Sequence, residues 1–136
     1  MTQVLVVDDS STIREFVHRT LEPEGYAVSE ADDGAQGLDA LKSATDRMVV
    51  LLDYQMPQLD GAQVLTEVAR VGTPLTNHEY YVITAAENTF PPAFIDLLRY
   101  LSIRVLPKPL EPRSLVVAVQ AAAERLSAIP EKPIES

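Results

Sequence analysis

Short, nearly uninterrupted aliphatic runs recur along this chain, and they restrict its fold more than any other feature. The clearest are VLVV at 4–7, MVVLL at 48–52, YYVIT at 80–84 and IRVL at 103–106; YAVSEA at 26–31 is weaker and alternates more. A strand that is apolar at almost every position needs both faces covered, as parallel strands between helix layers are. The runs therefore predict a parallel sheet, with 26–31 as an edge or half-exposed strand.

The segments between these runs have the spacing of amphipathic helices. Apolar residues share one helical face in each: Ile13, Phe16, Val17 and Leu21; Leu38 and Leu41; Val64, Leu65 and Val68; Leu115, Val119, Ala122 and Leu126. Strands and helices thus alternate five times, which predicts an α/β fold with helices on both faces of the sheet.

Helix boundaries carry their own signals. Ser10 or Ser11 can cap the first helix, and PEG at 23–25 ends it. Pro91 and Pro92 fit the first turn of a helix that runs to about residue 101, and Pro112 fits the first turn of the last helix.

Length and composition limit the function classes. With 136 residues, we expect one domain over 1–127 and a short polar tail over 128–136. The formal net charge of -9 argues against direct nucleic-acid binding, and the absence of cysteine excludes disulfides and thiolate metal sites. There is no signal-peptide pattern and no apolar run long enough to insert into a membrane, so we expect a cytoplasmic protein.

Polar residues whose side chains can bind ligands or take part in a reaction stand where the predicted strands end. Asp8 and Asp9 end the first strand, Asp53 the third and Thr84 the fourth, and Lys108 follows the fifth. In an open parallel sheet these ends form one rim, where ligands bind. Clustered carboxylates repel each other unless a cation offsets them, and Mg²⁺ suits such oxygen ligands.

Each of these residues also has a plainer explanation when taken alone. DDS after a strand is a common helix cap, and Asp53 suits a loop that follows a strand. Thr84 suits a strand because it is β-branched, and Lys108 between two prolines suits a turn. Only the ordered set, in which each member stands at the end of a strand, is poorly explained in this way.

The motifs VLVVDDS (4–10), VVLLDYQMPQLDG (49–61), ITA (83–85) and LPKPL (106–110) stand in an order and at a spacing that resemble the receiver domain of two-component response regulators. The resemblance covers about residues 1–127. It implies a flavodoxin-like, doubly wound (βα)5 fold, with a five-stranded parallel sheet in the order 2-1-3-4-5.

The resemblance also implies roles for the rim residues. Asp53 would accept a phosphoryl group, Thr84 would act as a switch hydroxyl, and Lys108 would pair with phosphoryl oxygens. The implied cofactor is Mg²⁺, with Mn²⁺ as an alternative, and its ligands would be Asp9 directly, Asp8 mainly through water, Asp53, and the backbone carbonyl of Gln55.

Some positions around the site follow the family and others depart from it. A cis bond before Pro109 would aim the preceding lysine into the site, and Gly61 would let the loop after Asp53 turn into the next helix. Many members carry an aromatic residue three before the lysine, but Val105 stands here. Ala85 and Ala86 follow the switch threonine, and the small side chain of Ala86 leaves access to the site open.

We therefore expect a phosphoacceptor response regulator rather than an enzyme acting on a separate substrate. Its partners would be a sensor histidine kinase or histidine phosphotransfer protein and a downstream protein, without direct nucleic-acid or membrane binding, as a monomer or weak dimer. One alternative is a degenerate receiver that is only an interaction module. A haloacid-dehalogenase-type phosphatase is the other; that family has a second acid where Gln55 stands.

Overall fold

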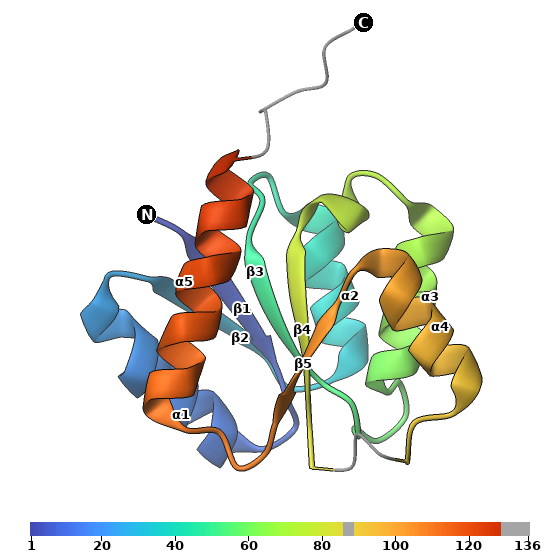
Figure 1. The fold of residues 1–136 in the computed structure, drawn as a ribbon, viewed down its shortest axis with the longest axis horizontal. Helices are drawn as coiled ribbons and strands as arrows, with labels where there is room; N and C mark the ends of the chain where they lie inside the picture. Colours follow the sequence, from blue (N-terminus) through green and yellow to red (C-terminus); the bar gives the residue numbers. More distant parts are fainter. Residues whose placement is uncertain (86–88, 129–136) are drawn as a thin grey trace, which may run out of the picture.

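A computed structural model describes residues 1–85 and 89–128 (Figure 1). Its strands are β1 (Gln3–Val7), β2 (Ala27–Ala31), β3 (Val49–Asp53), β4 (Glu79–Thr84) and β5 (Arg104–Pro107). They form one sheet in the order β2-β1-β3-β4-β5, and every neighbouring pair is parallel. The predicted fold class and strand order are confirmed.

Two layers of helices cover the sheet. The helical elements in chain order are α1 (Ser11–Leu21), η1 (Glu22–Glu24), α2 (Gly34–Ser43), α3 (Gly61–Val71), η2 (Leu75–Asn77), α4 (Pro92–Leu101) and α5 (Pro112–Ala128), where η marks a short 3₁₀ turn. Helices α1 and α5 pack on one face, and α2, α3 and α4 pack on the other (Figure 1). Within the described ranges, no helix is both long and apolar enough to cross a membrane.

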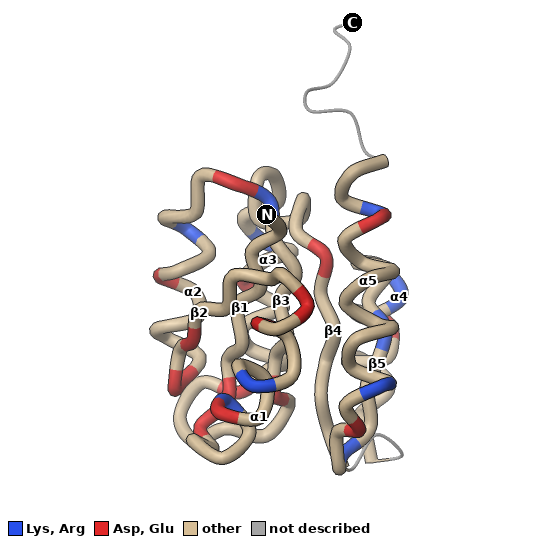
Figure 2. Tube along the Cα trace, turned by 90° about the vertical axis from the view of Figure 1, so that its left-hand side faces the viewer, with Lys and Arg blue, Asp and Glu red and all other residues tan. Residues whose placement is uncertain are grey.

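The aliphatic runs form the centre of this sandwich. All five residues of β3 are buried, as are four of the five in β1. Asp53 is the one charged residue in the sequences of β1 and β3, and Figure 2 shows Asp, Glu, Lys and Arg spread over the helices and loops. Because both faces are covered, successive residues point alternately into the two apolar cores, one beside α1 and α5 and the other beside α2, α3 and α4.

The predicted boundaries are correct to within one residue for the strands. β2 begins at Ala27, β4 at Glu79, and β5 covers 104–107 rather than 103–106. The informative shift is at β3, which includes Asp53, since this residue still pairs with Ile83 of β4. Asp53 is therefore part of the rigid strand rather than of the loop after it.

The helix signals also hold. Ser10 is the cap of α1, and its Oγ accepts a hydrogen bond from the Ile13 N–H at 3.3 Å. After α1 the chain makes one 3₁₀ turn, and this turn ends at Gly25, whose φ of 96° is in the left-handed region. Pro91 precedes α4 as its cap, and Pro92 and Pro112 are the first residues of α4 and α5.

Gly61 is required for a different reason from the one predicted. It is the first residue of α3, and a Cβ built there would lie 2.7 Å from the Asp53 carbonyl oxygen and 3.0 Å from the Tyr54 Cα. The Gly61 N–H donates to the Tyr54 carbonyl at 2.9 Å. Close approach of two backbones, rather than freedom to turn, therefore excludes a side chain here.

We predict that Gly61→Ala destabilises the protein. Alanine normally stabilises a helix by about 1 kcal/mol relative to glycine. Here the new methyl group meets backbone atoms that cannot yield without moving Asp53, so we expect a net loss of roughly 1–3 kcal/mol. Urea unfolding at equilibrium measures the change.

The control is Thr66→Ala in the exposed part of the same helix, which adds alanine without a new contact but removes the hydrogen bond from the Thr66 hydroxyl to the Ala62 carbonyl. Because the gain in helix propensity and the lost bond oppose each other, stability should change by less than about 0.5 kcal/mol. A Gly61→Ala protein that is more stable than the parent would show that helix propensity outweighs the close contact.

Candidate functional site

Three carboxylates meet where β1 and β3 end. The two strands pair in parallel, with Val7 opposite Leu52, so the next residues along each strand are Asp8 and Asp53. Asp8 is completely buried and Asp53 is 3% exposed, whereas the neighbouring Asp9 is exposed. One carboxylate oxygen from each of the three aspartates lies within 4.8 Å of the other two.

Lys108 is the cation of this cluster. Its Nζ lies 3.3 Å from Asp53 Oδ1 and 3.5 Å from Asp8 Oδ2. The backbone positions it, because Pro107 pairs with Thr84 and the Lys108 N–H donates to the Thr84 carbonyl at 2.9 Å. The Lys108–Pro109 peptide bond is cis, as the resemblance implied. Lysine, two buried acids and the end of β4 thus lie at one rim.

The other predicted site residues surround this rim. The Thr84 side chain is buried at the end of β4, and Ala85 after it is exposed, whereas Ala86 lies outside the described residues. Gln55 is exposed in the loop that follows Asp53. Val105 is half-buried, pairs with Val82, and packs against the core beside α2, α3 and α4.

Burial raises the pKa of Asp53 to about 6. The loss of water around its carboxylate is the main cause, and repulsion from Asp8 adds to it, while Lys108 acts in the opposite direction. The site therefore holds a carboxylate whose charge is not fully balanced by the side chains around it.

The donor set fits a hard divalent cation. Asp8 Oδ1 accepts from the Ser10 N–H at 2.9 Å, but the buried Asp8 Oδ2 has no hydrogen-bond partner among the described residues. A buried carboxylate oxygen in that situation is costly unless it is balanced by a charge, here the Lys108 ammonium at 3.5 Å. Oxygen ligands from Asp8, Asp9 and Asp53 are those that Mg²⁺ prefers.

Arg14 holds the backbone at Asp8 in place, and the sequence analysis did not identify this residue. Its Nη1 donates to the Asp8 carbonyl and its Nε to Glu30 Oε1, both at 2.6 Å. The Arg14 side chain is 14% exposed, so this bridge from α1 to β2 is partly shielded from water. An arginine in the first turns of an amphipathic helix has no feature in the sequence that separates it from a surface residue.

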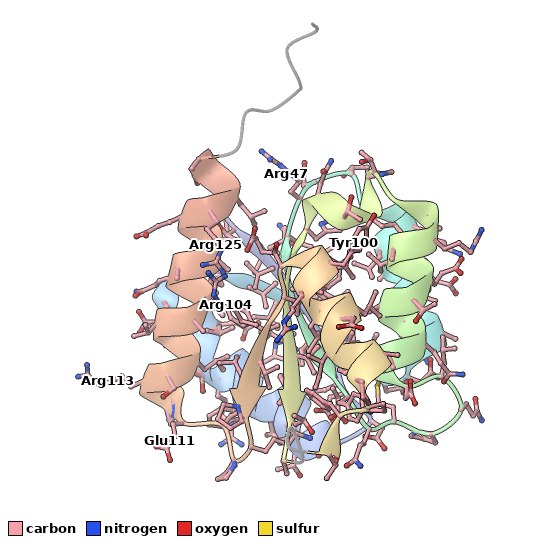
Figure 3. The ribbon with its side chains drawn as sticks, turned by 45° about the vertical axis from the view of Figure 1, so that its right-hand side comes forward. Arg47, Tyr100, Arg104, Glu111, Arg113 and Arg125 are labelled. Atoms are coloured by element: carbon pink, nitrogen blue, oxygen red, sulfur yellow. The ribbon has the colours of Figure 1, made fainter. Side chains whose placement is uncertain are left out.

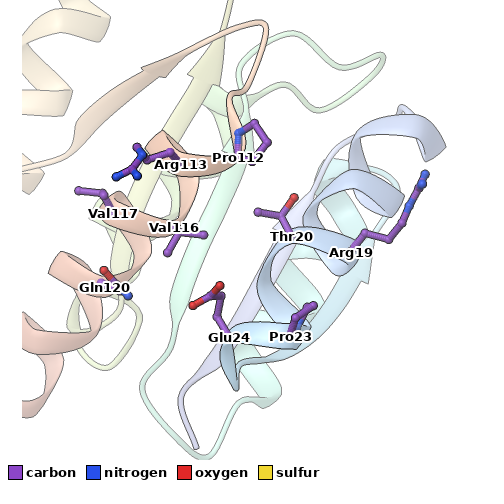
Figure 4. A pocket seen from close by; sticks show the side chains of 9 residues that line it. All are labelled: Arg19, Thr20, Pro23, Glu24, Pro112, Arg113, Val116, Val117 and Gln120. Atoms are coloured by element: carbon purple, nitrogen blue, oxygen red, sulfur yellow. The ribbon is translucent and has the colours of Figure 1, made fainter.

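One surface hollow adjoins the site, lined by Tyr54, Gln55 and Met56 of the loop after Asp53, whereas another lies away from it. The latter, of about 590 Å³, runs between α1 with η1 and α5, and is lined by residues such as Thr20, Pro23, Pro112 and Val116 (Figure 4). None of the predicted site residues lines it. The candidate site is thus a charged rim of the sheet rather than an apolar pocket.

We predict that Asp53→Asn stabilises the protein when divalent ions are absent. Between the ordinary carboxyl pKa of 3.8 and the native value of about 6, the native state binds more protons than the unfolded state. Stability therefore falls as pH rises through this window, and the full penalty is present above it. Asparagine removes a penalty of about 1–3 kcal/mol at pH 8.

Urea unfolding of both proteins in a chelator, from pH 4 to pH 8, measures this difference. The gain should shrink towards pH 4, where Asp53 itself is protonated. Asp96→Asn, which removes the same charge from an exposed position on α4, is the matched control and should show little change. A gain that is the same at every pH would contradict the burial of charge as its cause.

Comparison with known proteins places this geometry in a family. The family model described as response regulator receiver domain matches residues 4–120. The chain is 31% identical to the transcriptional regulatory protein CpxR homolog of Haemophilus influenzae, covering 100% of this chain and 56% of that protein. It is 33% identical to response regulator MprA of Mycobacterium sp. (strain KMS), covering 92% and 52%. The chain thus spans about half the length of these curated relatives.

Solved structures agree. The chemotaxis protein CheY4 of Vibrio cholerae matches with a TM-score of 0.75 and 28% identity, covering 90% of this chain and 98% of that one. A CheY-like response regulator receiver domain protein from Methanospirillum hungatei JF-1 matches with a TM-score of 0.81 and 26% identity, covering 94% and 98%. Together with the acid cluster at the sheet rim, these matches show that the chain belongs to the response regulator receiver domain family of two-component systems.

Proposed function

We propose that Asp53 is the phosphoryl acceptor of this receiver domain. The observation that carries the proposal is the contact of a buried, strand-end carboxylate with Lys108 at 3.3 Å, beside two further acids. The strand holds Asp53 in a fixed place, since all five residues of β3 are buried. Rigid placement of the acceptor is what transfer of a group to it needs.

The reaction joins one Asp53 oxygen to phosphorus. As that bond forms, the bond from phosphorus to the donor breaks, and the donor's carboxylate or imidazole leaves with the electron pair. With a pKa of about 6, Asp53 is mostly ionised at neutral pH and is therefore a nucleophile. The Lys108 ammonium would offset charge on the transferred oxygens, and the Thr84 hydroxyl would donate a hydrogen bond to them.

A divalent cation belongs to this proposal. Asp8, Asp9 and Asp53 would hold Mg²⁺, or Mn²⁺ in its place, together with the backbone carbonyl of Gln55. Bound there, the cation supplies positive charge that neutralises the phosphoryl oxygens. The buried Asp8 Oδ2, which has no hydrogen-bond partner among the described residues, supports this assignment.

The proposals for the phosphoryl donor and for the downstream partner rest on family membership. The donor would be a sensor histidine kinase or a histidine phosphotransfer protein, and the phosphorylated domain would act through contact with another protein. The domain would act only on its own phosphoryl group. A receiver that never carries phosphate is disfavoured, because its Asp53 would keep a costly buried charge for no chemical use. A phosphatase of the haloacid dehalogenase type is disfavoured because Gln55 stands where that family needs an acid.

We predict that acetyl phosphate with Mg²⁺ adds one phosphoryl group to the protein. Intact-mass analysis should show a species heavier by about 80 Da. Asp53→Asn should not show it, while Asp96→Asn, the exposed control, should. A chelator should abolish the reaction in the unaltered chain. An equal mass increase in the Asp53→Asn protein would disprove the assignment of the acceptor.

We also predict that Arg14→Lys weakens Mg²⁺ binding. Lysine keeps the positive charge but lacks the guanidinium that bonds the Asp8 carbonyl and Glu30 through two separate nitrogens, so the turn that carries Asp8 and Asp9 loses a support. Loss of such a supporting group typically weakens metal binding by about ten-fold or more. Isothermal titration measures the dissociation constant.

Arg19→Lys is the matched control, since Arg19 stands on the same helix with its side chain 74% exposed. It should bind Mg²⁺ as the unaltered protein does. If Arg14→Lys also binds normally, the bridge behind Asp8 does not set the geometry of the metal ligands.

A further inference from the structure

Three aromatic rings pack together between the site and α4. The Tyr54 ring centroid lies 4.6 Å from that of Phe90 and 4.9 Å from that of Phe94, and the Phe90 and Phe94 centroids are 4.8 Å apart. These are close contacts at the tilted and edge-on angles that aromatic rings favour. We call these residues the aromatic triad.

One end of the aromatic triad is attached to the phosphorylation site. Tyr54 directly follows Asp53 in the chain, and its N–H donates to the Ile83 carbonyl at 3.0 Å. Its own carbonyl accepts from the Gly61 N–H at 2.9 Å. The backbone of Tyr54 is thus tied to β4 and to the start of α3, which fixes the origin of the Tyr54 side chain one residue from the acceptor.

The other end is attached to α4. Phe94 is in the first turns of this helix and is 3% exposed. Phe90 is followed by Pro91 and Pro92, and each proline fixes its own φ and restricts the residue before it. This connection is stiff, so a displacement of the Phe90 ring moves the start of α4 rather than being absorbed by a hinge.

Strand β5, which lies beside β4, has no aromatic residue that could link the site to α4. β5 has the sequence RVLP, and Val105 is only half-buried against the core. Thr84 is two residues after Val82, which belongs to the same core as Phe94, so the Thr84 side chain points towards that layer as well. The rings next to the site on this face come from the end of β3 and the start of α4.

We propose that the aromatic triad transmits the phosphorylation state of Asp53 to α4. This inference rests on the proposed function, since it concerns the response of the domain to phosphoryl transfer. A phosphoryl group on Asp53 adds bulk and negative charge between Lys108 and Thr84, so the chain around the acceptor must adjust. Interiors are close-packed, and the interlocked rings therefore shift together instead of deforming one by one.

Fluorine NMR on the unaltered sequence tests the proposal directly. The chain has three phenylalanines, and incorporation of 4-fluorophenylalanine gives one resonance each for Phe16, Phe90 and Phe94. On phosphorylation by acetyl phosphate with Mg²⁺, the Phe90 and Phe94 resonances should shift. Phe16, which packs in the other core beside α1 and α5, should stay. Intact mass on the same sample shows that the phosphoryl group is present.

Variants then separate transmission from phosphorylation. Hydrogen–deuterium exchange of α4 should change on phosphorylation in the unaltered chain and in Tyr54→Phe, which keeps the ring. In Tyr54→Leu the change in α4 should be lost, although the mass increase is still seen. Tyr100→Leu is the matched control, because Tyr100 is on the same helix, 76% exposed and outside the triad (Figure 3).

The two failures are distinguishable. If the unaltered chain gains mass while the Phe90 and Phe94 resonances stay in place, the triad does not transmit. The same holds if phosphorylated Tyr54→Leu shows the full change in α4. If the unaltered chain gains no mass, the proposed function has failed instead.

Discussion

The register between β1 and β3 is the constraint on which the site depends. Val7 pairs with Leu52, so Asp8 and Asp53 leave the two central strands side by side at the same rim. A shift by one residue would turn every side chain of one strand to the opposite face and separate the two acids. The valines and leucines of these strands are completely buried, or nearly so, and their packing on both faces prevents such a shift. The apolar strands and the acidic site are therefore two consequences of one arrangement.

That arrangement concentrates negative charge where water is scarce. The raised pKa of Asp53 is the direct sign of the conflict, and the Lys108 ammonium relieves only part of it. The surrounding structure holds these charged residues in place regardless: Arg14 bonds the Asp8 carbonyl, and the Lys108 N–H donates to the Thr84 carbonyl. Because the buried carboxylates repel each other and lack water, a bound positive charge would stabilise the folded state. This is the condition for binding a cation tightly.

Much of this could be predicted from the sequence because the signals are local. Aliphatic runs, helix caps and the order of strand-end residues identify the fold and place Asp53 and Lys108 at one rim. What could not be predicted depends on approach between distant segments. The need for glycine at 61 comes from the Asp53 carbonyl oxygen 2.7 Å from where a Cβ would be, and the role of Arg14 comes from a bridge to another strand. The sequence shows that residue 105 is a valine and not an aromatic residue. It does not show that the Tyr54 ring contacts those of Phe90 and Phe94.

The two helices beside β5 are held to the sheet in different ways. Arg125 projects from α5 towards the sheet, where its Nε donates to Glu79 at 2.7 Å and its Nη2 to the Tyr81 hydroxyl at 3.1 Å (Figure 3). The Tyr81 hydroxyl in turn donates to the Ala118 carbonyl at 2.8 Å. Hydrogen bonds depend on distance and angle, so this network resists sliding of α5. The buried residues of α4 are Phe94 and Leu98, and apolar contacts are non-directional. Of the two helices, α4 is the one whose first turn contacts the ring next to Asp53, and its buried side chains hold it by packing.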